Sequence, residues 1–267
     1  MSHSEQLNFV ETVVGEIKCA DFFNINVLEI GSYDRNGSIR KHFNVKNYLG
    51  VDLINGPGVD LVYDGKKLEL NNKLFDITIS SECFEHDPNW DNTFKNMMRY
   101  TKSGGLVIFT CASKGRPEHG TLRTNPKDSP GTSAIGSDYY KNLSESNFLE
   151  KFKFEFLFED YFFITQKTSK DLYFVGKVKN DNFLSDIELN FSSLYKKIIF
   201  NQKLLKKSKR KKISYLLFMI IKNIDLPLRN LLLLQNSEYY YQNYILFRRN
   251  IIKILLKITN IKFLLIK

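Results

Sequence analysis

The residues best suited to chemistry follow one apolar run near the middle of this chain. The segment Phe75–Ser80 predicts a strand, and Ser81, Glu82, Glu85 and His86 come soon after it. Imidazole has the one unperturbed pKa suited to taking a proton near neutral pH, so His86 is a candidate base. Glu82 and His86 would face one metal ion only if this stretch were helical, and we expect no metal site.

A second group of reactive side chains lies in Cys111–Pro130, a segment rich in glycine, proline and charge. It is too long for an ordinary connection, and loops of this length at the edge of an α/β sheet usually carry function. Arg116, Glu118 and Arg123 would suit an anionic, hydroxyl-rich substrate, and His119 is a second candidate base. The alternative is a solvated loop with local salt bridges.

A third group marks a ligand site near the N-terminus. An apolar run, Val27–Ile30, ends at Gly31, and a second run ends in Asp52, 21 residues after that glycine. Such β-α-β units bind nucleosides at the carboxyl ends of their strands, where a carboxylate accepts the ribose hydroxyls. The tight G-x-G-x-x-G fingerprint is replaced by a longer loop, and Glu29 would repel a phosphate. We therefore expect a nucleoside that carries a cationic amino group rather than NAD or ATP.

Four features together resemble the class I S-adenosylmethionine-dependent methyltransferases over residues 25–180. They are the apolar-Glu-apolar-Gly pattern, the strand ending in Asp52, FDITISSECFEH at 75–86 and KSGGLVIFT at 102–110. The resemblance implies methyl transfer with S-adenosylmethionine as cofactor. A narrower resemblance is to members encoded in bacterial surface-polysaccharide clusters. It depends on the segments EIGSYDRNGSIR, GVDLINGPGVD, HDPNW and GRPEHGT. That narrower likeness implies O-methylation of a small or lipid-linked sugar.

The resemblance also implies roles for single residues. Either His86 or His119 would be the base, with Arg116 anchoring the acceptor beside Glu118 and Arg123. Asp64 would lie near the adenine, although a turn residue capping the next segment explains it equally well. The residues expected to contact the cofactor are Glu29, Gly31, Ser32, Tyr33, Asp52, Asp64, Ser81 and Glu82.

The expected fold is α/β, a Rossmann-like seven-stranded methyltransferase sheet with helices on both faces. Apolar spacing in residues 4–23 predicts a first helix, and Trp90–Met98 predicts another. Residues 152–166 and 171–178 predict a closing antiparallel hairpin. The methyltransferase domain should therefore comprise residues 1–180, followed by a basic, mainly helical extension over 181–267.

Charge separates these two parts. Residues 1–180 carry a net charge of −2 and residues 181–267 a net charge of +12, which together give the +10 of the whole chain. The three cysteines have neither paired nor metal-ligand spacing, which favours a reducing compartment. The N-terminal stretch lacks the pattern of a signal peptide, so we expect a cytoplasmic protein.

The basic extension has three interpretations. Seven cations lie within Lys203–Lys212, before an apolar run at 213–221 that is too short to cross a bilayer, and a basic amphipathic pattern follows at 249–261. This suits residues 203–267 to an anionic membrane surface, at the inner face of the membrane. Packing against the domain or a homo-oligomer interface is the second interpretation. Nucleic acid is disfavoured, because the tyrosines at 239–241 are not interleaved with cations.

Two other functions remain open at this stage. The extension could recruit an RNA or protein substrate to a methyltransferase. Alternatively, the loose loop after Gly31 could mark a non-catalytic scaffold that keeps the fold and has lost the reaction.

Overall fold

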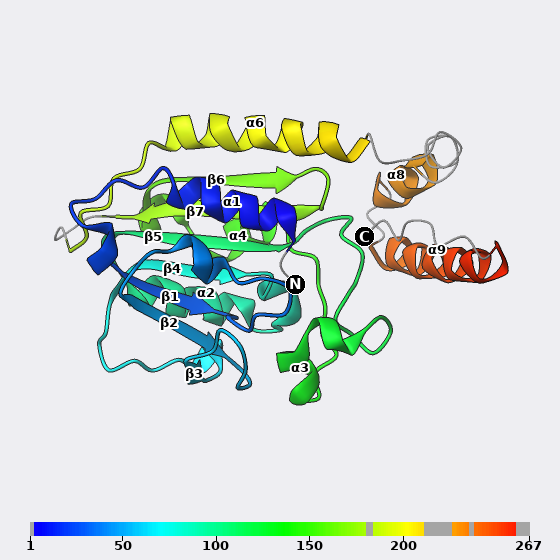
Figure 1. Cartoon of the computed structure of the whole chain (residues 1–267), viewed down its shortest axis with the longest axis horizontal. Coiled ribbons are helices and arrows are strands. Elements are labelled where there is room, and N and C mark those ends of the chain that lie inside the picture. The colour runs from blue at the N-terminus through cyan, green and yellow to red at the C-terminus, as the bar shows by residue number, and fades with distance from the viewer. Residues whose placement is uncertain (1–2, 180–183, 211–225, 235–237, 260–267) are drawn as a thin grey trace. The chain divides into compact units, whose positions relative to one another are not determined.

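The computed structural model describes residues 3–179, 184–210, 226–234 and 238–259. The chain divides into two compact units, residues 1–211 and 212–267. The first unit contains a seven-stranded sheet in the order β3-β2-β1-β4-β5-β7-β6 (Figure 1). Strands β1 to β5 are parallel, and β7 is antiparallel to both β5 and β6. The strands are β1 Asn26–Ile30, β2 Asn47–Asp52, β3 Leu61–Val62, β4 Phe75–Ser81, β5 Thr101–Ala112, β6 Phe158–Gln166 and β7 Asp171–Val178.

Helices cover both faces of this sheet, as the sequence predicts. One hydrophobic core packs α2 and the short helices α4 and α5 against the sheet, and a second core packs α1 and α6 against its other face. In α2, Trp90, Phe94 and Met97 recur at helical spacing and are all buried. The helices of this unit are α1 Ser4–Val14, α2 Trp90–Tyr100, α3 Pro130–Ala134, α4 Glu145–Lys151, α5 Phe154–Leu157 and α6 Phe191–Arg210.

The connection from β1 to β2 differs from the expected β-α-β unit. Its helical part is reduced to one 3₁₀ turn, Ile39–His42. A polar turn takes the preceding residues, since Asp34 Oδ1 accepts the backbone N–H of Gly37 at 2.7 Å and Gly37 has a φ of +117°. A helix cannot begin within such a turn, so the loop stays irregular beside the carboxyl end of β1.

Helix α6 extends the first unit beyond the boundary expected at residue 180. Its side chains Phe191, Leu194 and Ile198 are buried in the core that contains α1. The Asn201 side chain also donates to Thr12 Oγ1 at 3.1 Å. The first part of the basic extension therefore packs on the methyltransferase sheet.

The described residues of the second unit form two helices, α8 Leu226–Leu234 and α9 Glu238–Thr259. Within it, Arg229 donates to the hydroxyl of the buried Tyr241 at 2.9 Å. No helix in the described parts of the chain combines the length and apolarity needed for a membrane span. The apolar run at 213–221 lies outside the described residues, as do the last two cations of Lys203–Lys212.

Candidate active site

One pocket opens at the carboxyl ends of β1, β2 and β4. All eight residues expected to contact the cofactor line it, although they come from four separate parts of the sequence. These residues are Glu29, Gly31, Ser32, Tyr33, Asp52, Asp64, Ser81 and Glu82.

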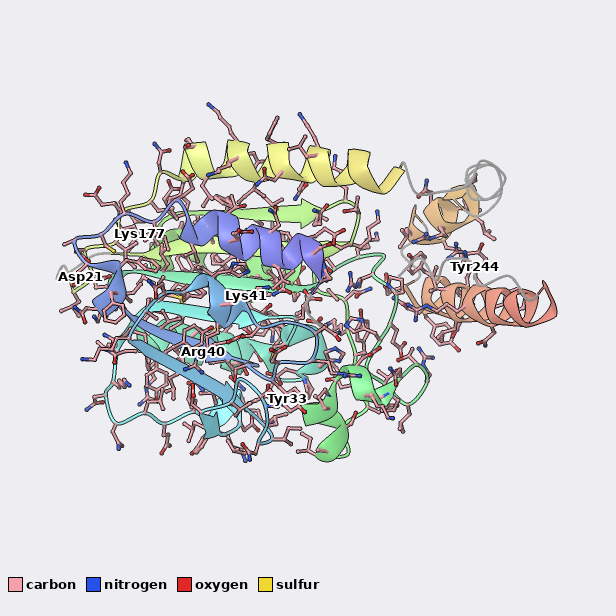
Figure 2. The ribbon with its side chains drawn as sticks, in the orientation of Figure 1. Asp21, Tyr33, Arg40, Lys41, Lys177 and Tyr244 are labelled. Carbon is pink, nitrogen blue, oxygen red and sulfur yellow. The ribbon has the colours of Figure 1, made fainter. Side chains whose placement is uncertain are left out.

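Gly31 and Asp52 shape the floor of the pocket. Gly31 has a φ of +85°, and a Cβ at this position would lie 2.8 Å from the Cβ of Cys83, so only glycine fits. Asp52 accepts the backbone N–H of Tyr33 at 3.0 Å, and its other oxygen accepts the N–H of Leu53 at 2.7 Å. Tyr33 thus lies on the loop that closes over the end of β2 (Figure 2). Burial raises the pKa of Asp52, while these hydrogen bonds oppose the shift.

Glu29 provides a buried carboxylate next to this floor. It is 4% exposed and accepts a hydrogen bond from the Tyr48 hydroxyl at 2.7 Å. Burial is the main reason that its pKa rises to about 8. A cationic ligand in the pocket would favour the ionised form, because an opposite charge offsets the cost of desolvation.

Asp64 fits both interpretations given by the sequence, a residue of the cofactor site and a turn residue that caps the next segment. It lines the pocket, and it also caps the 3₁₀ turn Gly65–Lys67, where its side chain accepts the Lys66 N–H at 3.2 Å.

One segment of the pocket lining, which lies against Asp52, was not predicted from the sequence. Residues 128–132, 135 and 137 line the pocket. Gly131 approaches so closely that a Cβ there would lie 2.8 Å from Asp52 Oδ1. The segment begins two residues before the end of the flagged loop, and the only local signal was Pro130 at the start of α3.

The two candidate bases lie together at the end of β4. The 3₁₀ turn Phe84–His86 places the His86 ring on the pocket wall. The His119 ring meets it edge-on, with centroids 5.0 Å apart. Burial lowers the pKa of His86 to about 3 and that of His119 well below its ordinary value, so both rings are neutral at pH 7.

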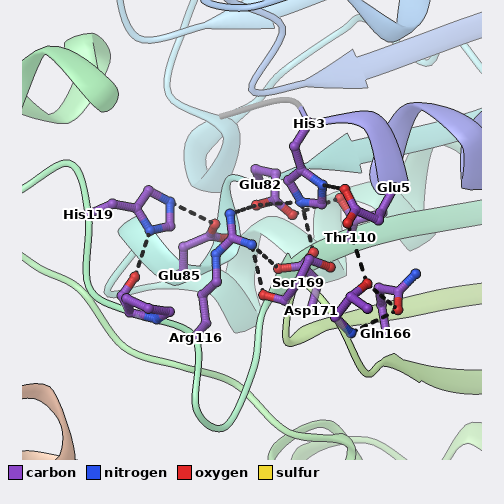
Figure 3. A network of polar contacts seen from close by, with 12 residues as sticks. His3, Glu5, Glu82, Glu85, Thr110, Arg116, His119, Gln166, Ser169 and Asp171 are labelled. Atoms are coloured by element: carbon purple, nitrogen blue, oxygen red, sulfur yellow. Dashed lines mark hydrogen bonds and ion pairs between the residues drawn. The ribbon is translucent and has the colours of Figure 1, made fainter. Parts of the chain in front are cut away.

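The predicted acceptor anchor, Arg116, is held by other protein groups. It lies 3.2 Å from Asp171 and 3.8 Å from Glu82, and it donates to the Ser169 carbonyl at 2.8 Å (Figure 3). His3 forms a further ion pair with Asp171 at 2.8 Å. We call His3, Glu82, Arg116 and Asp171 the paired cluster. Its buried charges largely compensate one another, so it fixes the loop after β5 to the start of α1 and to β7.

Glu118 and Arg123 form an ion pair with each other, and Thr121 donates to Glu118 at 2.6 Å. Neither belongs to the pocket lining. These local contacts agree with the salt-bridge alternative for this loop. Contact with an acceptor remains a prediction for both residues.

The sheet order and the pocket agree with the fold expected from the resemblance to class I S-adenosylmethionine-dependent methyltransferases. Residues 36–109 match a family model described as "Methyltransferase domain". This match supports the predicted enzyme activity, methyl transfer with S-adenosylmethionine as cofactor. No curated protein matches the sequence.

Several solved structures are similar to this chain. An S-adenosylmethionine-dependent methyltransferase from Clostridium acetobutylicum is 14% identical, with a TM-score of 0.45; the match covers 67% of this chain and 93% of the other. The N-methyltransferase NodS from Bradyrhizobium japonicum, in complex with S-adenosyl-L-homocysteine, is 15% identical, with a TM-score of 0.40 and coverages of 66% and 85%.

The pocket residues fit this cofactor. Glu29 supplies a buried carboxylate for the methionine ammonium, and Asp52 supplies one for the ribose hydroxyls. The Ser32 hydroxyl lines the same pocket, and its oxygen is buried without a hydrogen-bond partner among the described residues. A polar ligand would satisfy that oxygen.

Proposed function

We propose that this enzyme methylates an oxygen of a sugar, either small or lipid-linked, during surface-polysaccharide synthesis. The observation that carries the proposal is the pair of imidazoles at the carboxyl end of β4, where His86 lines the cofactor pocket and His119 packs on it. A sugar hydroxyl must lose its proton during methylation, and these two side chains are the candidates for promoting that step. The polysaccharide setting is supported by the sequence motifs alone.

The bound cofactor supplies an electrophilic methyl group, so the protein mainly orients the acceptor and handles a proton. The loop after β5 carries several hydroxyl groups, and Ser129 lies close to His86, since a Cβ at Gly120 would lie 2.7 Å from Ser129 Cβ and 2.8 Å from His86 Cε1. Such groups suit an acceptor rich in hydroxyls. We further propose that the enzyme works in the cytoplasm, and that its basic extension holds it at the inner face of an anionic membrane.

The test is methyl transfer by the full chain from radiolabelled S-adenosylmethionine to nucleotide sugars, lipid-linked oligosaccharides, RNA and protein substrates. We expect label in a sugar, and NMR should place the new methyl on oxygen. Label confined to RNA or protein would overturn the proposal in favour of recruitment by the basic extension.

Cofactor binding is measured separately by calorimetry. Asp52→Ala should weaken S-adenosylmethionine binding by about 1.5–3 kcal/mol, the scale for hydrogen bonds to a charged group. Asp91→Ala, on α2 and outside the pocket lining, is the control. If wild-type protein binds no cofactor, the scaffold alternative holds.

A further inference from the structure

Glu85, His86 and His119 form a second group of buried polar side chains, which we call the unpaired cluster. Each is at most 6% exposed, and one ligand atom from each lies within 4.8 Å of the other two. Both Glu85 oxygens, both His86 ring nitrogens and His119 Nε2 are buried without a hydrogen-bond partner in the part of the chain that the structure describes. A buried polar atom without a hydrogen-bond partner destabilises the fold, so a ligand that satisfies these atoms would stabilise it.

The tautomer of His119 is set by its surroundings. Its Nδ1 lies 3.2 Å from the Pro117 carbonyl, which can only accept a hydrogen bond, so Nδ1 carries the proton. The lone pair of Nε2 therefore faces Glu85 Oε1 at 3.8 Å, too far for a hydrogen bond (Figure 3). Metal-bound histidines commonly use one nitrogen as ligand while the other donates to a carbonyl.

Three chain segments hold the unpaired cluster in place. The Lys141 N–H donates to the Glu85 carbonyl at 2.8 Å, which joins the end of β4 to the segment before α4. Gly120, with a φ of +70°, lies so close that a Cβ there would be 2.8 Å from His86 Cε1. The ligand atoms are thus preorganised.

We propose that Glu85, His86 and His119 bind a divalent transition-metal ion such as Zn²⁺, Mn²⁺ or Co²⁺. Two imidazoles and one carboxylate, with a position left for a further ligand, are a set that such ions favour. The positive charge would satisfy the buried carboxylate and the unpartnered nitrogens together. This departs from the sequence expectation of no metal, because only the fold brings His119 to Glu85.

The role of the ion rests on the proposed function, whereas its binding does not. An acceptor hydroxyl that coordinates the ion has a lowered pKa and releases its proton to water. An electron pair on the oxygen forms the new bond to the methyl carbon. The carbon–sulfur bond breaks, and its electrons neutralise the sulfonium. His86 and His119 would thus act as ligands rather than as direct bases.

The paired cluster is the rival location for the ion. There the His3 ring is engaged by Asp171 at 2.8 Å, and Arg116 adds a fixed positive charge. A protonated imidazole has no lone pair for a metal, so this cluster should not compete.

The test is titration of Co²⁺ into the chelator-treated full chain, followed by visible absorption and by metal analysis after dialysis. The chain has four histidines, so single replacements locate the ion. His119→Ala and Glu85→Gln should each weaken Co²⁺ binding by tenfold or more. His42→Ala and His3→Gln should leave it unchanged, and calorimetry with S-adenosylmethionine should show that each variant is folded.

The absence of Co²⁺ binding by folded wild-type protein would overturn the proposal, as would loss of binding in His3→Gln alone. The two proposals fail separately. Co²⁺ binding by a chain that methylates no sugar would leave the metal site standing. If the chelator-treated chain methylated sugars at an unchanged rate, the proposed function would stand, and a role for the metal ion in the reaction would be ruled out.

Discussion

Two histidine–carboxylate clusters flank the end of β4, and they differ in how their charges are compensated. In the paired cluster, His3 and Arg116 offset the carboxylates of Asp171 and Glu82. In the unpaired cluster, Glu85 faces neutral imidazoles, and burial raises the pKa of its carboxyl to about 8. Buried charge that is compensated within the chain indicates a structural role, whereas buried titratable groups held neutral without hydrogen-bond partners indicate a ligand site.

The turn after β4 separates the two clusters. Glu82 has a φ of +53°, a left-handed conformation uncommon for a residue other than glycine. It lies 3.8 Å from Arg116, while Glu85, one turn later, faces His119. Strain of this kind is concentrated at functional sites, and here it directs two nearby carboxylates to different partners.

The largest expected effect is on catalysis, and it comes from the unpaired cluster. His86→Asn should lower the rate of methyl transfer by about 10²–10⁴-fold, because His86 promotes loss of the acceptor proton whether it acts as a metal ligand or as a base. The measurement is kcat with saturating acceptor, and His42→Asn is the control. Near wild-type kcat in a folded His86→Asn variant would show that the unpaired cluster does not take part in the reaction.

The largest expected effect on stability comes from the paired cluster. Asp171→Ala leaves His3 and Arg116 buried without their main partner, so the free energy of unfolding should fall by about 3–5 kcal/mol. Urea denaturation measures this change. The more exposed Asp91–Lys151 pair provides the control, since Asp91→Ala should change stability by about 1 kcal/mol or less. If Asp171→Ala and Asp91→Ala lowered the free energy of unfolding equally, the buried ion pairs of the paired cluster would stabilise the protein no more than an exposed ion pair does.

The pH dependence of stability should sharpen the same contrast. Burial alone would lower the pKa of His3, but hydrogen bonds to Asp171 and Glu5 raise it to about 9. Because the folded-state pKa is raised, the stabilisation is fully present below pH 6.5 and is lost as the pH rises past about 9. Wild type should therefore exceed His3→Gln in stability at pH 6, by about 1–3 kcal/mol for a charged hydrogen bond. A gap that widens above pH 9 would contradict this sign.

The smallest expected effect concerns Arg123, whose side chain is 47% exposed beside Glu118. Arg123→Ala should lower the free energy of unfolding by less than about 1 kcal/mol, because solvent screens an exposed pair. Thermal denaturation measures it. A rise in the KM for the acceptor in Arg123→Ala would support the predicted contact between Arg123 and the substrate. An unchanged KM would show that Arg123 does not contact the substrate.

The sheet was predictable because each strand has a recognisable local pattern in the sequence. Continuous apolar runs identify β1 and β4, and the turn at 167–170 identifies the hairpin of β6 and β7. Parallel strands end at one edge, so Gly31, Asp52 and Ser81 could be assigned to a single pocket before the structure was known.

Contacts between distant segments were not predictable in this way. Arg116 was expected to face substrate, yet its partners Asp171 and Ser169 come from the β6–β7 hairpin. Likewise, no spacing in the sequence indicates that His119 packs on His86. Such contacts depend on the path of a long loop, which neither periodicity nor composition specifies.

One uninterrupted connection, from β5 to α4, serves both ends of the reaction. It contributes His119 to the unpaired cluster, and a few residues later it places Gly131 against Asp52. The cofactor pocket and the unpaired cluster therefore share one wall, so a substitution that reshapes this connection should affect both.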